Sequence, residues 1–318
     1  MALPPDPAGV VEIPGPWQHR YIAANGARFH VVEADAEGST EGRPLVLLLH
    51  GFPEFWWTWH AQLPVLAANG YRAVAMDLRG YGGSDKPPRG YDPVTLAADV
   101  AGVIKALGER RAVIVGQGWG GYVGWATAAL HPDQVTALCA VAAPHPLVML
   151  PLLLSALRSS RTVGALGHVL AMQAPFFPER RVSRPESSYV RDHLHAWSSP
   201  ESSFPDPETA KLYHDALSLW PASHCALEYH RWLVRSRLRS DGRRFNILME
   251  PPLEVPVCVV HGADDPAVPV KGSMRSQEWV QAPFDAHVLA HTGHFPHEED
   301  PETFNAVLLP WLAGLPRG

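Results

Sequence analysis

An apolar strand that leads into a glycine-rich turn is the most informative stretch of the sequence. It consists of Val113-Ile114-Val115-Gly116-Gln117-Gly118-Trp119-Gly120-Gly121. A strand, a Gly-x-x-x-Gly turn and a helix form the frame of a nucleophile elbow, in which small residues allow a sharp turn that exposes the central side chain. The central residue is Gly118, which has no side chain to attack a substrate. A phosphate-binding loop is the alternative, but its Lys-Ser/Thr ending is absent.

Three other segments carry groups suited to acid–base chemistry. His50-Gly51-Phe52-Pro53 follows an apolar run, where the backbone N–H groups of Phe52 and Trp119 are candidates for an oxyanion hole. His261 to Pro266, which includes Asp264 and Asp265, follows another apolar run. His291 to Glu299, which includes His294, follows the last one. Along the chain the elbow comes first, the acidic segment second and the histidine segment last, which is one of the orders in which the residues of a hydrolytic triad occur.

These segments require a sheet whose strands end close together. Short apolar runs, which suit strands buried on both faces, occupy residues 45–49, 73–76, 112–115, 135–141, 255–260 and 286–289. Helical patterns occupy residues 57–68, 95–107, 121–130, 273–280 and 301–312. Their alternation predicts a parallel sheet wrapped by helices. Asn25-Gly26, between residues 20–23 and 28–33, predicts an antiparallel hairpin at the sheet edge.

The alternation stops between residues 146 and 254. This stretch has helical segments, no clear strand, and joints rich in proline and serine at 198–200 and 204–207. We therefore predict a helical lid (146–254) inserted into an α/β core made of residues 1–145 and 255–318.

The chain resembles the α/β-hydrolase superfamily, and specifically its epoxide hydrolase branch. The matching stretches extend over almost the whole chain: His50-Gly51-Phe52-Pro53-Glu54, Asp77-Leu78-Arg79-Gly80-Tyr81-Gly82, Trp119-Gly120-Gly121-Tyr122, Ala143-Pro144-His145-Pro146 and Gly293-His294-Phe295-Pro296-His297-Glu298. The resemblance implies a mostly parallel eight-stranded sheet flanked by helices, a cap over the pocket, and neither a metal nor an organic cofactor. Enzymes of this branch carry an elbow aspartate that forms an ester with the epoxide, and a His–Asp pair then hydrolyses that ester. By position, His294 matches the base and Asp265 the acid, with Asp264 as the alternative.

Four positions depart from the family pattern. Gly118 replaces the nucleophile, and Gln117 stands where the family typically has histidine. Two cap tyrosines hold the epoxide oxygen in the family, and their positions match His230 and His168, with Tyr229 one residue away from His230. We expect protonated imidazoles to donate hydrogen bonds in place of these hydroxyls.

These departures leave three hypotheses for the function. In the first, His294 and Asp265 act as a general base on a small apolar substrate, epoxide-like or polycyclic, without a covalent ester. The reaction would be a hydrolysis or a lyase- or cyclase-type rearrangement. In the second, the chain is an inactive pseudo-enzyme that binds a ligand or partner. In the third, Gly118 is an introduced substitution in an ordinary epoxide hydrolase.

Composition limits the remaining classes. A hydrophobic fraction of 46% with 18% charged residues indicates a globular chain. A net charge of −6 offers no basic face for nucleic acid, and no apolar run is long enough to span a membrane. Three cysteines and no secretion signal favour the cytoplasm, and arginine-rich usage favours a bacterial source. The expected partner is a small-molecule substrate, and a homodimer is left open.

The 17 histidines raise one more hypothesis, a zinc site. Zn²⁺ accepts three histidines and a water, which His294 together with His168 and His230 could supply. His291, His294 and His297, which recur every third residue, are a second set with a spacing that suggests a metal site. That stretch is predicted to be a loop, however, and the resemblance already accounts for His294 and His297. We therefore predict no metal and no cofactor.

Overall fold

The computed structural model describes residues 7–35, 40–149 and 163–316. An eight-stranded sheet with the order β1-β2-β4-β3-β5-β6-β7-β8 forms its centre. The strands are β1 (Trp17–Ala24), β2 (Ala27–Ala34), β3 (Leu45–Leu49), β4 (Arg72–Met76), β5 (Ala112–Gln117), β6 (Val135–Val141), β7 (Val257–Gly262) and β8 (Phe284–Leu289). The β1–β2 and β2–β4 pairs are antiparallel, and the other neighbouring strands pair in parallel. The predicted α/β fold with a mostly parallel eight-stranded sheet is confirmed.

The antiparallel edge forms because of the turn at Asn25-Gly26. Asn25 and Gly26 both have positive φ angles, 44° and 73°. Two such residues in succession match the right-handed twist of the flanking strands in a two-residue hairpin. The predicted hairpin is therefore confirmed, with β1 as an edge strand of the sheet.

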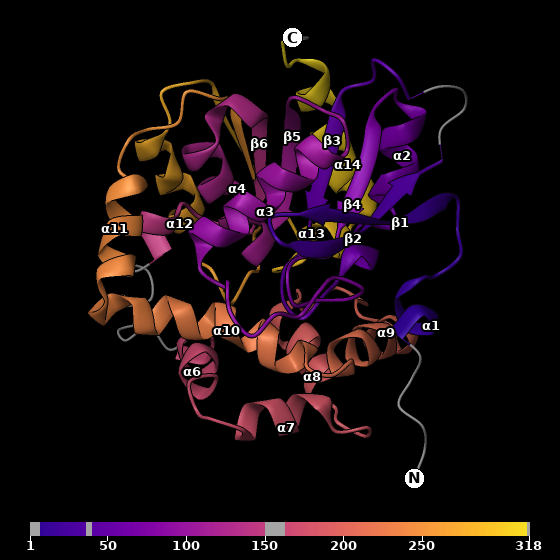
Figure 1. Cartoon of the computed structure of the whole chain (residues 1–318), viewed down its shortest axis with the longest axis vertical. Coiled ribbons are helices and arrows are strands. Elements are labelled where there is room, and N and C mark those ends of the chain that lie inside the picture. Colours follow the sequence, from indigo (N-terminus) through magenta and orange to yellow (C-terminus); the bar gives the residue numbers. More distant parts are fainter. Residues whose placement is uncertain (1–6, 36–39, 150–162, 317–318) are drawn as a thin grey trace.

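Helices cover both faces of the sheet, whose central strands are fully buried. In Figure 1, α3 (Pro93–Ala106) and α4 (Trp119–Leu130) lie in front of the sheet and α14 (Pro301–Ala313) lies behind it. Every residue of β3, β5 and β7 is buried, as their continuous apolar sequences require. Shorter helices are α1 (Pro7–Val11), α2 (Gln62–Ala68), α12 (Val270–Arg275) and α13 (Pro296–Glu299).

Two predicted helices are shorter than their sequence pattern suggested. The 57–68 pattern is a 3-10 turn at Trp56–Trp59 followed by α2, and the 273–280 pattern contains the end of α12 and a 3-10 turn at Ser276–Trp279. Further 3-10 turns occupy Pro132–Gln134 and Ser236–Leu238. Such tight turns are common at helix ends, and apolar spacing does not distinguish them from α-helix.

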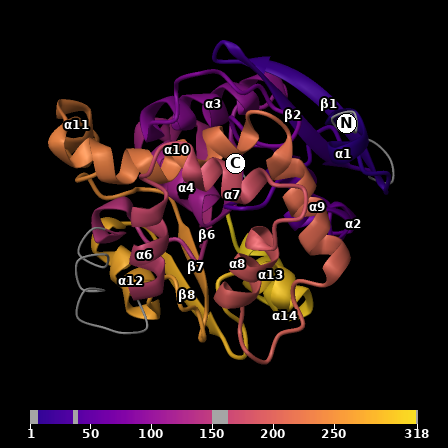
Figure 2. The same cartoon turned by 90° about the horizontal axis from the view of Figure 1, so that it is seen from below.

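Helices α6 to α11, which lie between β6 and β7 in the described part of the chain, form a separate layer that we call the inserted helices. They are α6 (Val163–Ala171), α7 (Phe177–Ser183), α8 (Tyr189–Trp197), α9 (Pro207–Ser218), α10 (Ala222–Arg235) and α11 (Ser240–Leu248). Figures 1 and 2 show most of them beneath one end of the sheet, with α7 far from the strands. The described part of this stretch contains no strand, and the lid segment 150–162 lies outside the described residues. No helix within the described ranges has both the length and the apolar character to cross a membrane.

Candidate active site

The turn between β5 and α4 is sharp because Gly116 and Gly120 allow close backbone contacts. A Cβ on Gly116 would lie 2.5 Å from the backbone of Gly120, and a Cβ on Gly120 would lie 2.2 Å from the carbonyl oxygen of Leu49. Gly118, at the start of α4, has φ 51° and ψ −114°. This conformation is costly for residues with a side chain and is characteristic of strained positions at functional sites. The predicted elbow geometry is therefore present.

Gly118 has room for a side chain although it lies in a crowded turn. A Cβ placed on it would meet His294 Nε2 at 3.6 Å and the Cα of Gly51 at 3.7 Å, both ordinary van der Waals distances. The site has therefore not collapsed around the missing side chain. The space that a nucleophile would fill remains beside the imidazole of His294.

His294 and Asp265 form the hydrogen-bonded pair expected from the resemblance. Nδ1 of His294 lies 2.8 Å from Oδ2 of Asp265, whereas Nε2 makes no hydrogen bond within the described residues. Asp264, the alternative acid, accepts instead a hydrogen bond from the hydroxyl of Ser199. The structure thus brings Asp265 rather than Asp264 to His294, and it leaves Nε2 free to take a proton.

Asp265 is buried but remains ionised because every lone pair is directed at a donor. Its Oδ1 accepts the backbone N–H groups of Ala267 and Val268 at 2.7 and 2.9 Å, and Nε2 of His261 lies 3.2 Å from Oδ2. Burial alone would raise the pKa of this carboxyl, but His294 and His261 outweigh burial and hold the pKa below its usual value. A fixed carboxylate in this position stabilises the imidazolium that forms when His294 accepts a proton.

The loop that carries His294 is held from two sides. The side-chain amide of Gln117 donates to the backbone carbonyl of His294 at 3.0 Å, and the N–H of His294 donates to the carbonyl of Trp197 on the inserted helices at 2.8 Å. The carboxylate of Glu299 accepts the N–H groups of Gly293 and Ser199. Gln117, which departs from the family pattern, therefore holds the backbone of His294 and does not line the inner side of the turn.

An inner cavity of about 90 Å³ lies at this site. Gly118, His294, Phe52, Trp119 and His230 all line it. The backbone N–H groups of Phe52 and Trp119 make no hydrogen bonds within the described residues. Both are therefore available as the predicted oxyanion donors, since an oxyanion hole needs N–H groups that have no other acceptor.

His230 lies where the sequence placed it, but the prediction of a protonated donor is wrong. Its Nε2 accepts a hydrogen bond from the indole N–H of Trp119 at 3.2 Å, and its Nδ1 lies 3.3 Å from the carbonyl of Ala226. Both ring nitrogens are thus engaged. Burial lowers the pKa of His230 to about 4, so the ring is neutral near pH 7.

Tyr229 does not line the pocket, so its candidacy as a substrate-binding residue is wrong. Its buried hydroxyl donates to the backbone carbonyl of Arg79 at 2.8 Å, and its ring packs against Tyr81 and Tyr91 of the core. Adjacent residues on a helix point about 100° apart, so Tyr229 and His230 cannot face the same cavity.

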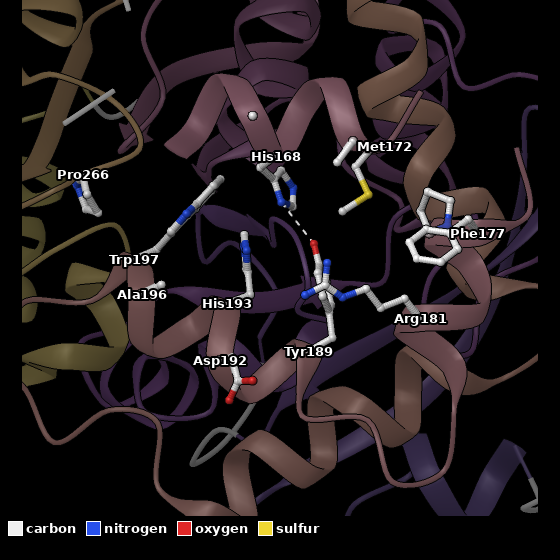
Figure 3. Close-up of a pocket in the computed structure, with 13 residues that line it drawn as sticks. His168, Met172, Phe177, Arg181, Tyr189, Asp192, His193, Ala196, Trp197 and Pro266 are labelled. Carbon is white, nitrogen blue, oxygen red and sulfur yellow. Dashed lines mark hydrogen bonds between the residues drawn. The ribbon is translucent and has the colours of Figure 1, made fainter. Parts of the chain in front are cut away.

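His168 borders a second and larger space, the outer chamber, of about 540 Å³ (Figure 3). Its Nδ1 lies 3.1 Å from the hydroxyl of Tyr189. Burial, and then the neighbouring imidazoles of His193, His230 and His294, hold the pKa of His168 well below its usual value. The expected protonated donor at this position is therefore also wrong.

One face of α8 reaches the site although no motif in the sequence pointed to it. Tyr189, His193 and Trp197 recur every fourth residue, a spacing that puts them on one side of a helix. The ring of Trp197 lies between those of His193 (4.1 Å between centroids) and His294 (5.0 Å). This i, i+4, i+8 pattern was the available signal, but nothing in the sequence showed that the face turns toward the site.

The three histidines that recur every third residue have different partners. His291 is exposed and pairs with Glu201, His294 holds Asp265, and Nε2 of His297 lies 2.6 Å from the hydroxyl of Thr58. A single metal ion needs ligands that point to one place. The arrangement of these side chains therefore does not support a shared zinc.

Another group, Glu54, His297 and Glu298, has donor atoms within 4.8 Å of one another in the described part of the chain. Burial raises the pKa of Glu54 well above its usual value and that of Glu298 to about 8. The hydroxyl of Thr58 donates to Glu54, and that of Tyr213 donates to Glu298. These hydroxyl contacts make the group part of a buried hydrogen-bond network within the described residues.

Comparison with known proteins agrees with this geometry. Residues 44–301 match the family described as alpha/beta hydrolase fold. Epoxide hydrolase 3 of Xenopus tropicalis is 33% identical over 93% of this chain and 78% of its own, and Epoxide hydrolase A of Mycobacterium tuberculosis is 31% identical over 93% and 97%. The crystal structure of Epoxide Hydrolase A from Mycobacterium thermoresistibile, 26% identical, aligns over 94% of this chain and 99% of its own with a TM-score of 0.75. The chain therefore belongs to the α/β-hydrolase family, in its epoxide hydrolase-like branch.

Proposed function

We propose that this chain is an epoxide hydrolase-like enzyme in which His294 activates water directly, without an ester on the protein. The observation that carries the proposal is the position of Nε2 of His294. It faces the open space beside Gly118, 3.6 Å from where a side chain would begin, while Asp265 holds the other ring nitrogen. A water in that space would replace the carboxylate nucleophile of the relatives.

The reaction balances without a cofactor. Nε2 of His294 takes a proton from the water, whose oxygen attacks an epoxide carbon, and the carbon–oxygen bond of the ring breaks. The resulting alkoxide accepts hydrogen bonds from the N–H groups of Phe52 and Trp119 and recovers the proton from the imidazolium, giving a diol. General-base help of this kind contributes about 10²–10⁴-fold, and removing one oxyanion donor costs about 10²–10³-fold in comparable enzymes.

The inner cavity favours an apolar reacting group. Apart from the site residues, its walls include Tyr122, Met149, Val169 and Leu233. Such walls exclude water around a small electrophile, which strengthens the hydrogen bonds that hold it. We therefore infer an apolar substrate with an epoxide-like group, covered by the inserted helices acting as a cap.

The first test measures hydrolysis of styrene oxide by His294→Ala. We expect turnover to fall about 10²–10⁴-fold, because the general base is lost. His291→Ala is the matched control, since His291 lies in the same loop but is exposed and pairs with Glu201. Turnover in His294→Ala equal to that of the unmodified chain would exclude the proposal.

The second test is a single turnover in ¹⁸O-labelled water. Direct attack puts ¹⁸O into the diol in the first turnover and leaves no substrate adduct on the protein. An ester route would give a first diol that carries unlabelled oxygen from a side chain. That result, or an adduct detected by mass spectrometry, would contradict direct attack.

A non-catalytic binder is the second candidate, because Gly118 provides no nucleophile and the histidines of the inserted helices are neutral. It predicts retention of styrene oxide or a similar ligand in the site with no conversion over long incubation. Tight binding without any diol would favour this candidate over the enzyme.

A further inference from the structure

Positive charge is concentrated at the last of the inserted helices. In Figures 1 and 2, α11 (Ser240–Leu248) lies at an edge of the molecule. Residues 235–244, which include the 3-10 turn before α11 and the first half of the helix, contain five arginines and one aspartate. The whole chain carries a formal net charge of −6, so this segment is opposite in sign to the rest of the protein.

The inner face of α11 is held by buried side chains. Gly242, Phe245 and Met249 recur at spacings of three and four residues, which puts them on one side of the helix, and all three are buried. The ring of Phe245 packs against that of Trp232 with 5.3 Å between centroids. These contacts fix the rotation of α11, so the opposite face must point to solvent.

The outer face combines exposed apolar side chains with arginines. Ile247 lies four residues after Arg243 and three after Arg244, so the three side chains are neighbours on the helix surface. Leu238 precedes Arg239 in the turn before the helix. Leu238 is 92% exposed and Ile247 is 63% exposed. Arg239, Arg243 and Arg244 are exposed as well, and they make no ion pair within the described residues.

This combination suits the surface of an anionic lipid bilayer. Arginine binds lipid phosphate groups, and each cation near such a surface tightens binding about fivefold. Aliphatic side chains between the cations reach the boundary of headgroups and acyl chains, where they leave water. Interfacial helices that lie on membranes have this mixture of cations and apolar side chains.

Two other partners fit the same face less well. Phe245 is the one aromatic residue of segment 235–248 and it is buried, so this segment offers no exposed ring on which a nucleic acid base could stack. A second copy bound by two-fold symmetry would place the same arginines against one another, and like charges repel.

We propose that the outer face of residues 238–247 docks this protein reversibly on anionic lipid bilayers. Leu238 and Ile247 enter the headgroup region, and Arg239, Arg243 and Arg244 contact lipid phosphates. The helix lies on the surface and does not cross it. This inference is independent of the proposed function, because none of these residues lines the inner cavity or the outer chamber.

The experiment measures sedimentation of the full chain with sucrose-loaded vesicles. Vesicles of phosphatidylcholine alone are compared with vesicles that also contain phosphatidylglycerol. We expect binding to the anionic vesicles to be at least about tenfold tighter, and to weaken at high salt because salt screens the arginines. The double variant Arg243→Gln/Arg244→Gln should bind about 25-fold more weakly, from two losses of about fivefold each.

The matched control is Arg110→Gln/Arg111→Gln. These neighbouring arginines are also exposed, but they precede β5 (Ala112–Gln117), at the end of that strand away from the site and the inserted helices. The control removes the same charge and should leave vesicle binding almost unchanged. Circular dichroism and Tm check that every variant is folded.

A second readout tests whether the apolar side chains enter the bilayer. The three native cysteines are buried, so Leu238→Cys provides an exposed thiol for the environment-sensitive dye acrylodan. Its emission should shift to the blue with anionic vesicles and remain unchanged with phosphatidylcholine alone. Leu238→Ser/Ile247→Ser should weaken binding about tenfold while the salt dependence persists.

Four results would overturn the proposal. The first is no binding to anionic vesicles, or emission from the dye that does not change on binding. The second is an equal loss of binding in the control variant, which would indicate a general effect of charge. The third is binding of a labelled DNA duplex, measured by fluorescence anisotropy, without binding to vesicles. The fourth is a dimer in sedimentation velocity that Leu238→Ser/Ile247→Ser dissociates, which would assign the face to a second copy.

Discussion

Restoring a carboxylate at position 118 is the sharpest perturbation of this site. A Cβ there would meet its nearest neighbours, His294 Nε2 and Gly51 Cα, at 3.6 and 3.7 Å, so Gly118→Asp introduces no steric clash at that atom. The cost comes from the backbone, because φ is +51° and such conformations cost residues with side chains about 1–3 kcal/mol. We expect Tm to fall by roughly 2–10 °C, with the protein still folded.

The chemistry of this variant follows from the same distances. The new carboxylate would lie beside His294, where it can attack an epoxide carbon and form a hydroxyalkyl ester. Mass spectrometry after rapid mixing with styrene oxide should show a protein mass increased by that of one epoxide. Turnover should remain modest, because His168 and His230 are neutral and supply no strong acid to the opening ring, and a missing general acid costs about 10²–10⁴-fold.

Gly118→Asn is the matched control for this prediction. Asparagine has nearly the shape of aspartate and meets the same backbone cost at φ 51° and ψ −114°, but its amide forms no ester. We expect a similar Tm and no adduct. If folded Gly118→Asp also gave no adduct, the space beside His294 would not be the position of a nucleophile, and the reasoning from the elbow geometry would be refuted.

Three other perturbations test the surroundings of the site. Gly120→Ala should lower the free energy of unfolding by about 3 kcal/mol or more, because its Cβ would lie 2.2 Å from a carbonyl oxygen of β3. The control Gly167→Ala, in α6, places a Cβ that meets nothing within 4 Å, and it should leave Tm unchanged or slightly raise it, because alanine favours a helix over glycine by about 0.5–1 kcal/mol. Gln117→Leu removes the amide that holds the carbonyl of His294. The kcat for styrene oxide should then fall by up to about 10²-fold with little change in KM, because small misplacements of catalytic groups have effects of this size. An unaltered kcat would show that Gln117 does not position His294. Burial lowers the pKa of His145 to about 3, so the folded state binds fewer protons than the unfolded state and stability falls as the pH drops below about 6.5. The free energy of unfolding, measured with urea, should therefore fall between pH 7.5 and pH 5.5 by about 1.4 kcal/mol less in His145→Phe than in the unmodified chain. An equal fall in both proteins would contradict the lowered pKa of His145.

Local patterns were enough to predict most of the core. The runs at 45–49 and 135–141 are strands with those same limits, because continuous apolar residues of strand length have few alternatives in a chain with interspersed helices. Asn25-Gly26 identified the hairpin because its backbone conformation is a property of those two residues. Helix ends were less predictable, as in α12, because 3-10 turns share the apolar spacing of α-helices.

The site was only partly predictable. Gly118, His294 and Asp265 could be found because each follows a strand, and the carboxyl ends of parallel strands meet at one edge of a sheet. The inserted helices offer no such rule. Their residues reach the site through packing between helices, so Tyr229 was included in error and His193 and Trp197 were missed.

The sequence alone therefore determined the family, the lack of a side chain at position 118 and the histidine that we propose as the base. The tertiary structure decided the protonation and the partners of the histidines, because pKa values depend on burial and on neighbouring charges that come from distant segments. It also decided that the space beside Gly118 remains open and that a larger chamber shares Trp197 as a wall with the inner cavity. Cavities form between elements, and no single segment of the chain encodes them.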